Sequence, residues 1–406
     1  MKKTIRPIDE QLLQEAKKIV AERFGDKITI GSATYLSGPD RRNVLMRITL
    51  IHESKNIPHS IILKQSLVEK SDIDDKEAFD RFARDWSGLE FLSDLEITVP
   101  LAPQFYGGSK KNRFVLMEDL GTIQTSLIDL LMGNEKNKAL GALKRYMKII
   151  GQIHGLASDH TKKYHKILQR INPDALLWQD NFQDMFSKVA GRIKQFGFSI
   201  SPELNHEIDT IFTMAKNPGP FTTLMHGDIC PDNFFYHPET QEMRMIDFEW
   251  SFVGNALLDA VVLRMCMPTS WSMKAFPQDV VDSIEDVYRK ELAKSIPAAH
   301  NDTLYYKSYV AASAYWMLWR IVSLEDILDK EVVDFTTQNY LHLHHHWQPD
   351  DNLRKPRNVY RLEAFIEISQ KHGFFPELRR MAQYILKELK IRWPDVKPLE
   401  LYPAFK

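Results

Sequence analysis

Hydrophobic and polar positions divide the chain into a strand-rich first part and a mainly helical remainder. Apolar residues recur at helical spacing over residues 11–24 and 72–95, and the second of these segments has acids in its first turns, where a helix dipole favours them. Short apolar runs bounded by turn residues predict strands. The predicted strands cover residues 28–36, 44–51, 61–65, 104–106 and 114–118.

Beyond residue 121 the periodicity is mostly helical. One exception is a predicted β-hairpin, with strands over residues 234–236 and 243–248 and a Pro-containing turn at residues 237–241. The whole pattern therefore predicts an α+β protein, with a small antiparallel sheet followed by a larger helical part. The predicted helices of this part span residues 136–156, 173–196, 202–216, 301–329, 359–372 and 376–391.

Three oxygen-bearing side chains lie in and before the hairpin. Asn233 precedes its first strand and Asp247 is expected to end its second, so two residues fourteen apart in sequence are expected side by side. Asp228 comes five positions before Asn233. Carboxylate and amide oxygens suit Mg²⁺, so this arrangement predicts a magnesium-nucleotide site for phosphoryl transfer. The alternative is an ordinary hairpin with solvated acids.

The segments His226-Gly227-Asp228 with Asn233 and Ile246-Asp247-Phe248-Glu249 resemble motifs of the aminoglycoside phosphotransferase and choline kinase branch of the protein-kinase-like fold. The resemblance implies a two-lobed α+β fold. A nucleotide-binding lobe would span residues 1–121, with a hinge at about 117–121, and a helical lobe would span residues 122–406. It also implies ATP- and Mg²⁺-dependent phosphorylation of a hydroxyl group on a small molecule.

The resemblance implies roles for individual residues. The acid matching Asp228 accepts the proton of the substrate hydroxyl, and the residues matching Asn233 and Asp247 hold magnesium on the nucleotide phosphates. Glu249 resembles the choline kinase form of the motif and could bind a cationic acceptor. The His-Gly-Asp triplet leans toward the aminoglycoside branch, so antibiotic, choline-like, sugar and other metabolite alcohols all stay open as acceptors.

Lys64 is a cation within an aliphatic predicted strand, and such a side chain must reach an anion or extend to water. By resemblance it neutralises the charge of the α- and β-phosphates, and a strand-end lysine facing solvent is the alternative. The family pairs this lysine with an acid on the following helix. Spacing favours Asp85 and reach favours Glu90, and Asp85 is preferred.

Two further segments are expected to contact the nucleotide by resemblance. The turn that contains Ser37 and Gly38 would cover the phosphates, although it has one Gly and a Pro, and a plain hairpin loop is the alternative. Backbone groups of Glu118 and Leu120 would contact adenine at the hinge. Asp259 matches an acid that braces the catalytic loop, and a simple acid at a helix N-terminus is its alternative.

Two other features have a structural and a functional interpretation. The aromatic residues Tyr305, Tyr309, Trp316 and Trp319 recur at helical spacing, so a core stripe is favoured over a cage for a quaternary ammonium group. The histidine-rich run at residues 341–347 lacks a Cys or acid at ligand spacing, which favours solvated or core histidines over a metal site.

The composition indicates which partners and which cellular compartment are expected for the protein. The 406 residues carry a net charge of -1 and no basic tract, which argues against nucleic acid as a partner. The two cysteines, Cys230 and Cys266, form no Cys-x-x-Cys pair, and Cys230 is expected to be a small buried spacer. The start lacks an apolar signal region and no apolar run reaches about 18 residues. These features predict a cytoplasmic protein that does not bind membranes.

Two alternatives to a small-molecule kinase differ in class. A catalytically silent nucleotide-binding module is suggested by the irregular loop at residues 37–39 and by the uncertain helix acid. A protein-directed kinase is less favoured, because no activation segment or Ala-Pro-Glu sequence follows Asp247.

Overall fold

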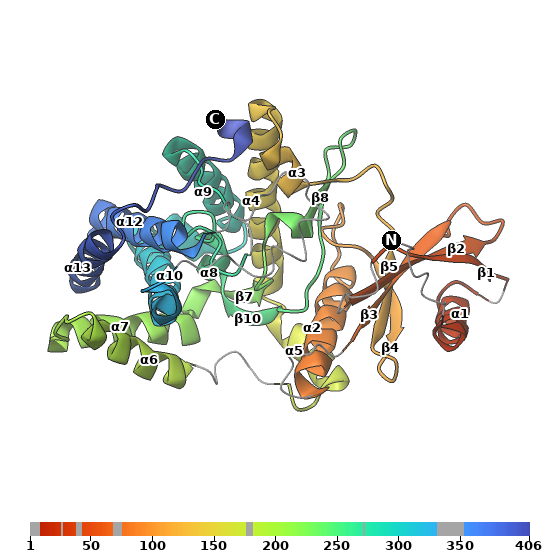
Figure 1. Ribbon diagram of the computed structural model, residues 1–406. Coiled ribbons are helices and arrows are strands. Elements are labelled where there is room, and N and C mark those ends of the chain that lie inside the picture. The colour runs from red at the N-terminus through yellow and green to blue at the C-terminus, as the bar shows by residue number, and fades with distance from the viewer. Residues whose placement is uncertain are drawn as a thin grey trace. The chain divides into compact units, whose positions relative to one another are not determined.

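The computed structural model describes residues 9–25, 27–37, 43–67, 75–175, 182–270, 273–330 and 353–406, with only the backbone for residues 182–186. The chain divides into two compact units (Figure 1). Unit 1 comprises Met1–Gln124, Lys162–Ala175 and His237–Ser251, and unit 2 comprises Thr125–Thr161, Leu176–Tyr236 and Phe252–Lys406. Gly38 and the histidine-rich run at residues 341–347 lie outside the described residues.

Unit 1 is built on a five-stranded antiparallel sheet with the order β1-β2-β3-β5-β4. All five predicted strands are present, with β4 shifted toward the C-terminus of its predicted range. Their bounds are Thr29–Tyr35 for β1, Asn43–Ile51 for β2, Ser60–Ser66 for β3, Phe105–Ser109 for β4 and Phe114–Glu118 for β5. The helices of this unit are α1 (Glu10–Phe24), α2 (Asp75–Ser93) and most of α5 (Thr161–Ile171), which was not predicted.

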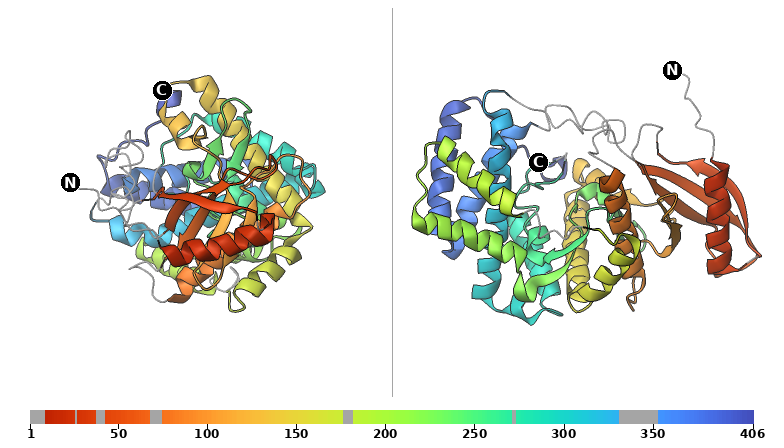
Figure 2. Two further views of the ribbon diagram at one scale, coloured as in Figure 1. Left: turned by 90° about the vertical axis from the view of Figure 1, so that its right-hand side faces the viewer. Right: turned by 90° about the horizontal axis from the view of Figure 1, so that it is seen from below.

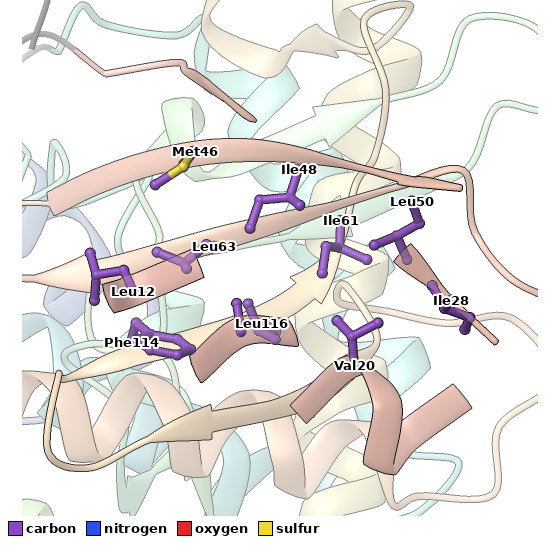
Figure 3. Packing of buried hydrophobic residues seen from close by; sticks show 11 residues of the cluster. Leu12, Val20, Ile28, Met46, Ile48, Leu50, Ile61, Leu63, Phe114 and Leu116 are labelled. Carbon is purple, nitrogen blue, oxygen red and sulfur yellow. The ribbon is translucent and has the colours of Figure 1, made fainter. Parts of the chain in front are cut away.

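Helix α1 packs its apolar stripe against one face of the sheet. Leu12 and Val20 of α1 join Leu63 of β3 and Leu116 of β5 in one buried cluster, which Figure 3 shows from close by. Successive side chains of a strand point to opposite faces, so Lys64 points away from this cluster. Its contact with Asp85 at 2.7 Å places α2 on that opposite face.

Unit 2 is mainly helical, as predicted. Helix α4 packs against α9, α10 packs against α6, α7, α8 and α12, and α12 lies beside α13, drawn in blue in Figures 1 and 2. None of the described helices is long and apolar enough to cross a membrane. The helices are α3 (Leu127–Met132), α4 (Lys136–Ser158), α6 (Phe182–Gln195), α7 (Pro202–Lys216), α8 (Ala256–Ala260), α9 (Gln278–Leu292), α10 (Asp302–Val322), α12 (Arg354–His372) and α13 (Pro376–Arg392).

Short strands connect these helices and lead into the candidate site. Strand β7 (Thr222–Met225) pairs antiparallel with β10 (Phe252–Asn255), and β6 (Thr125–Ser126) pairs with β8 (Phe234–Tyr236). The turn predicted after β8 is present, since the N–H group of His237 donates to the carbonyl of Glu242. Strand β9 (Met243–Met245) follows this turn.

Three predicted elements were too long. The helix expected over residues 301–329 ends at Val322, and a 3-10 helix covers Ser323–Ile327. The helix expected over residues 173–196 begins at Phe182 within the described part of the chain, and residues 173–174 form a turn. The strand expected over residues 243–248 ends at Met245. Asp247 has a φ of 70°, a left-handed conformation that a strand does not accommodate. Asp247 therefore lies beyond the strand and does not end it.

The aromatic stripe of α10 belongs to the core, as favoured from the sequence. Tyr305, Tyr309 and Trp316 are buried, and the Trp316 indole N–H donates to the carbonyl of Leu258 at 2.8 Å. Trp319 is half-buried and stacks beneath the Arg320 guanidinium at 4.8 Å. These contacts account for the stripe without a ligand.

Candidate active site

Lys64 lies between two carboxylates in unit 1. Its Nζ is 2.7 Å from Oδ2 of Asp85 and 2.6 Å from Oδ1 of Asp247. Glu90 instead accepts a hydrogen bond from the Trp86 indole and pairs with Arg170. Five residues along a helix correspond to a rotation of about 140° beyond one full turn, so Asp85 and Glu90 occupy different faces of α2. Asp85 therefore forms the ion pair with Lys64.

The electrostatics of this cluster favour a charged lysine. Burial lowers the pKa of Lys64, but the charges and hydrogen bonds of Asp247 and Asp85 outweigh this effect and raise the pKa above its usual value. Burial and the neighbouring charge of Asp247 raise the pKa of Asp85, against the opposing effect of Lys64. Two carboxylates around one ammonium leave an excess of negative charge. This excess fits an additional cation such as Mg²⁺.

Asp247 is the more accessible acid of this cluster. Its side chain is 25% exposed, whereas that of Asp85 is 3% exposed. The next residue, Phe248, is buried against Gly88 of α2. A Cβ atom at Gly88 would lie 2.5 Å from the Cβ of Phe248, so this close approach requires glycine. The packing of Phe248 thus fixes the backbone that carries Asp247.

The other unit 1 candidates have contacts within the protein. Glu249 is buried and accepts a 3.4 Å hydrogen bond from the Asn43 side chain. The Ser37 hydroxyl accepts a hydrogen bond from the N–H group of Leu45 at 2.9 Å. The N–H group of Glu118 donates to the Gln104 carbonyl at 2.8 Å.

The segment after β5 has an anchor that the sequence analysis missed. Asp119 accepts two hydrogen bonds from Arg47 and one from the Ser60 hydroxyl, at 2.5, 2.9 and 2.6 Å. Burial alone would raise the pKa of Asp119, but these hydrogen bonds and that from the Gly121 N–H group lower it. Leu120 is half-buried beside this anchor. Asp119 thereby fixes the backbone where Glu118 and Leu120 were expected to contact adenine.

Asp228 and Asn233 lie together in unit 2. The Asn233 amide nitrogen donates to the Asp228 carbonyl at 2.8 Å and lies 3.3 Å from Asp228 Oδ2. This orientation leaves the Asn233 amide oxygen as the group that could bind a cation. Gly227, between β7 and Asp228, has a φ of 78°, which favours glycine at this turn.

A buried network behind this loop holds its backbone. Oδ2 of Asp259 accepts a hydrogen bond from the N–H group of His226 at 3.1 Å and lies 3.4 Å from Nε2 of His154. The other nitrogen of His154 is 2.8 Å from the Tyr288 hydroxyl. Asp259 therefore braces the loop, and it is also an acid in the first turn of α8, so both interpretations hold. His154 was missed because it lies within the apolar periodicity of α4.

Cys230 is more than the expected buried spacer. It is 4% exposed, and its Sγ lies 2.8 Å from Oδ1 of Asp228. Burial and the nearby acids Asp228 and Asp232 raise the pKa of Cys230 well above its usual value, so it stays a thiol and donates a hydrogen bond. Cys230 and Cys266 are both free. In the part of the chain described here, no group of three or more His, Cys, Asp or Glu residues could hold a metal ion.

A comparison with protein-family profiles identifies the family of this chain. The sequence profile of the ecdysteroid kinase-like family matches residues 77–297, more than half of the chain. No curated protein sequence gave a match.

Several solved structures match this chain at low sequence identity. A choline kinase from Streptococcus pneumoniae shares 14% identity, over 90% of this chain and 100% of that chain, with a TM-score of 0.39. An ethanolamine kinase from Plasmodium vivax shares 12% identity, over 93% of both chains, with a TM-score of 0.44. An aminoglycoside 2′-phosphotransferase-IIIa shares 14% identity, over 89% of this chain and 98% of that chain, with a TM-score of 0.41.

The family match includes Asp85, Asp228, Asn233, Asp247 and Asp259. The α+β architecture consists of an antiparallel sheet followed by a mainly helical part. The chain belongs to the ecdysteroid kinase-like family.

Proposed function

We propose that the protein transfers the γ-phosphoryl group of Mg²⁺-bound ATP to a hydroxyl group of a small molecule. The observation that carries the proposal is the buried ammonium of Lys64 between the carboxylates of Asp85 and Asp247. An ammonium held in this way can neutralise phosphate charge, and the accessible acid beside it can bind magnesium.

In this proposal, residues 1–121 form the nucleotide-binding lobe and residues 122–406 the catalytic lobe. Lys64 binds the α- and β-phosphates, and Asp85 holds Lys64 in place. Asp247 and the amide oxygen of Asn233 are the magnesium ligands. The bound ion would neutralise the charge that develops on the phosphates. The backbone around Ser37 and Gly38 contacts the phosphates, and that of Glu118 and Leu120 contacts the base.

Asp228 is the proposed catalytic base. The acceptor oxygen forms a bond to the γ-phosphorus, the bond from this phosphorus to the β–γ bridging oxygen breaks, and ADP leaves. The acceptor proton passes to Asp228. Because the alcohol becomes acidic only as the new P–O bond forms, a carboxylate with an ordinary pKa suffices for this step. The protein mainly positions the reactants and neutralises charge.

The proposed acceptor is a hydroxylated small molecule. The family description makes an ecdysteroid a first acceptor to test, and choline, ethanolamine and an aminoglycoside follow from the names of the similar structures. Glu249 was expected to bind a cationic acceptor. Its burial and its hydrogen bond from Asn43 support a structural role better. The two free cysteines support a reducing compartment such as the cytoplasm.

The test is acceptor-stimulated release of ADP with a panel of these compounds, repeated with Asp228→Asn. The variant should lose turnover by a factor of about 10²–10⁴, as for loss of a general base, while its affinity for ATP stays within about twofold of the wild type. Asp209→Asn, at an exposed acid on α7, is the matched control and should keep full turnover. Full turnover of Asp228→Asn would exclude Asp228 as the base.

A wild-type protein that binds ATP tightly but shows neither acceptor phosphorylation nor Mg²⁺-dependent hydrolysis of ATP would contradict the proposal. That result would instead support a catalytically silent nucleotide-binding module.

A further inference from the structure

The segment over residues 265–270 of unit 2 has an unusual backbone. Cys266 and Met267 follow each other at φ values of 53° and 33°, in the left-handed region that non-glycine residues rarely adopt. Both side chains are buried. Such a conformation persists only where the surroundings impose it, and it often occurs at functional sites.

Two arginines of α12 stabilise this backbone conformation of residues 265–270. Arg357 and Arg361 lie one helical turn apart and are 2% and 4% exposed. Their guanidinium groups donate to backbone carbonyl groups of the segment, so that helix α12 holds the strained backbone from one side. The accepting carbonyls are those of Met265, Cys266, Met267 and Ser270, at 2.9, 2.7, 3.3 and 2.5 Å.

The segment over residues 265–270 places the exposed hydroxyl of Thr269 beside Asp228. Oγ1 of Thr269 lies 3.5 Å from Oδ1 of Asp228, at the long end of the hydrogen-bond range. The same oxygen accepts the hydrogen bond from Cys230 at 2.8 Å. The other oxygen, Oδ2, is the one near the Asn233 amide nitrogen. The two oxygens of the carboxylate therefore have different surroundings.

We propose that Cys230 and Thr269 are positioning residues for Asp228. Their two donors hold Oδ1 and fix the rotation of the carboxylate, so that Oδ2 faces the acceptor hydroxyl and receives its proton. Arg357 and Arg361 contribute by holding the segment that carries Thr269. This inference rests on the proposed function, because it assigns a geometry to the proposed base.

The relative activities of the alanine and serine variants of Cys230 distinguish a positioning role from a purely structural role. If Cys230 only fills space, alanine should be tolerated better than serine, because a buried hydroxyl without a suitable acceptor is unfavourable. If Cys230 orients Asp228, serine should be better than alanine, because it keeps a donor. The order of these two variants therefore separates the two roles.

The experiment measures kcat and both KM values for Cys230→Ala, Cys230→Ser, Thr269→Val and Thr269→Ser. Loss of either donor should lower kcat by about three- to tenfold with the KM for ATP unchanged, as expected for one lost hydrogen bond. Each serine variant should recover most of the loss. Thr210→Val is the control, since the Thr210 hydroxyl bonds to His206 within α7, and it should behave as the wild type.

The arginine contacts are tested by Arg361→Lys, which keeps the charge but cannot reproduce both hydrogen bonds of the guanidinium. It should lower kcat like Thr269→Val, and the double variant should be no slower than the slower single variant. Independent, multiplicative effects of the two substitutions would overturn the role of the arginine contacts in placing Thr269.

Thermodynamic cycles provide a readout that does not need turnover. Asp228→Ala and Cys230→Ala should have non-additive effects on the free energy of unfolding, because they remove the two ends of one hydrogen bond. Additive effects would overturn the inference even if no acceptor is ever found. Wild-type kcat in both Cys230→Ala and Thr269→Val, together with loss of turnover in Asp228→Asn, would overturn it while the proposed function stands.

Discussion

The backbone N–H group of Phe248 donates a 2.8 Å hydrogen bond to Oδ1 of Asp85, whose Oδ2 lies 2.7 Å from the ammonium of Lys64. One buried side chain of α2 thus holds both the strand lysine and the backbone directly after Asp247. Lys64 also contacts Asp247 itself. Substitution of Asp85 should therefore affect the stability of unit 1 and the proposed nucleotide site together.

Asp85→Ala should destabilise the protein and raise the KM for ATP. It leaves the Phe248 N–H group without its acceptor and removes one of the two carboxylates that surround the buried ammonium. Breaking a buried pair in this way typically costs about 3–5 kcal/mol of unfolding free energy. Asp85→Asn should cost less, because its amide oxygen can still accept from Phe248. Denaturant unfolding and the KM for ATP measure both effects.

Glu90→Gln is the matched control for Asp85. Glu90 pairs with Arg170, whose side chain is 55% exposed, and such pairs contribute at most about 1 kcal/mol. The control should keep the KM for ATP of the wild type. An Asp85→Ala variant as stable and active as Glu90→Gln would contradict the importance of the Lys64–Asp85 pair.

Gly88→Ala should destabilise the protein although alanine is the better helix former. The new Cβ would lie 2.5 Å from the Cβ of Phe248, so α2 or the segment that carries Asp247 must move. Such overpacking typically costs about 1–3 kcal/mol, against a gain of about 1 kcal/mol from helix propensity. Displacement of Asp247 should also raise the Mg²⁺ concentration required for half-maximal turnover.

The control for Gly88→Ala is Gly141→Ala in α4, where an added Cβ meets no atom within 4 Å. This substitution should stabilise the protein by up to about 1 kcal/mol and leave the Mg²⁺ requirement unchanged. Equal effects of the two substitutions on stability would show that Phe248 does not restrict α2 at this point.

Local patterns were sufficient to predict most elements of the fold. The spacing of apolar residues located α1, α4 and α7, and short apolar runs bounded by turn residues located the five strands. Helix α2 shows how the choice between Asp85 and Glu90 could have been made from sequence. Asp85 shares the buried face with Phe82 and Leu89, whereas Glu90 does not.

The residues that were missed depend on tertiary contacts. Asp119 and Arg47 are 72 positions apart, and Thr269 and Asp228 are 41 apart. A local sequence pattern does not show which residues so far apart along the chain come into contact. The left-handed conformation of Asp247 was equally hidden, because the residue lies within a short, mainly apolar run, residues 243–248, that predicts a strand. The packing of Phe248 on α2 outweighs the strand propensity of this segment and determines its backbone conformation.

Asp259→Leu should impair turnover and stability through the loop that it braces. The buried N–H group of His226 would lose its acceptor, which typically costs about 1–3 kcal/mol. Asp259→Asn can still accept from this group and should therefore retain more activity. The measurements are kcat and the free energy of unfolding. Identical behaviour of the two variants would argue against the hydrogen bond to His226 as the function of Asp259.

The stability of the protein should decrease as the pH falls below neutrality. Burial lowers the pKa of both His165 and His372 from the usual value of 6.5, and nearby cations act in the same direction. The folded state therefore binds fewer protons than the unfolded state between the lowered pKa values and pH 6.5. The stabilising contribution of both residues is complete above pH 6.5 and is lost as the pH falls through the folded-state pKa values.

Substitution of both histidines by phenylalanine removes this titration. For His372, phenylalanine also keeps an aromatic ring against Tyr306, with which the imidazole stacks at 3.8 Å. The free energy of unfolding of the double variant should depend less steeply on pH than that of the wild type between about pH 7 and about pH 5. Denaturant unfolding over this range provides the measurement. Parallel curves for the two proteins would mean that other groups account for the acid sensitivity.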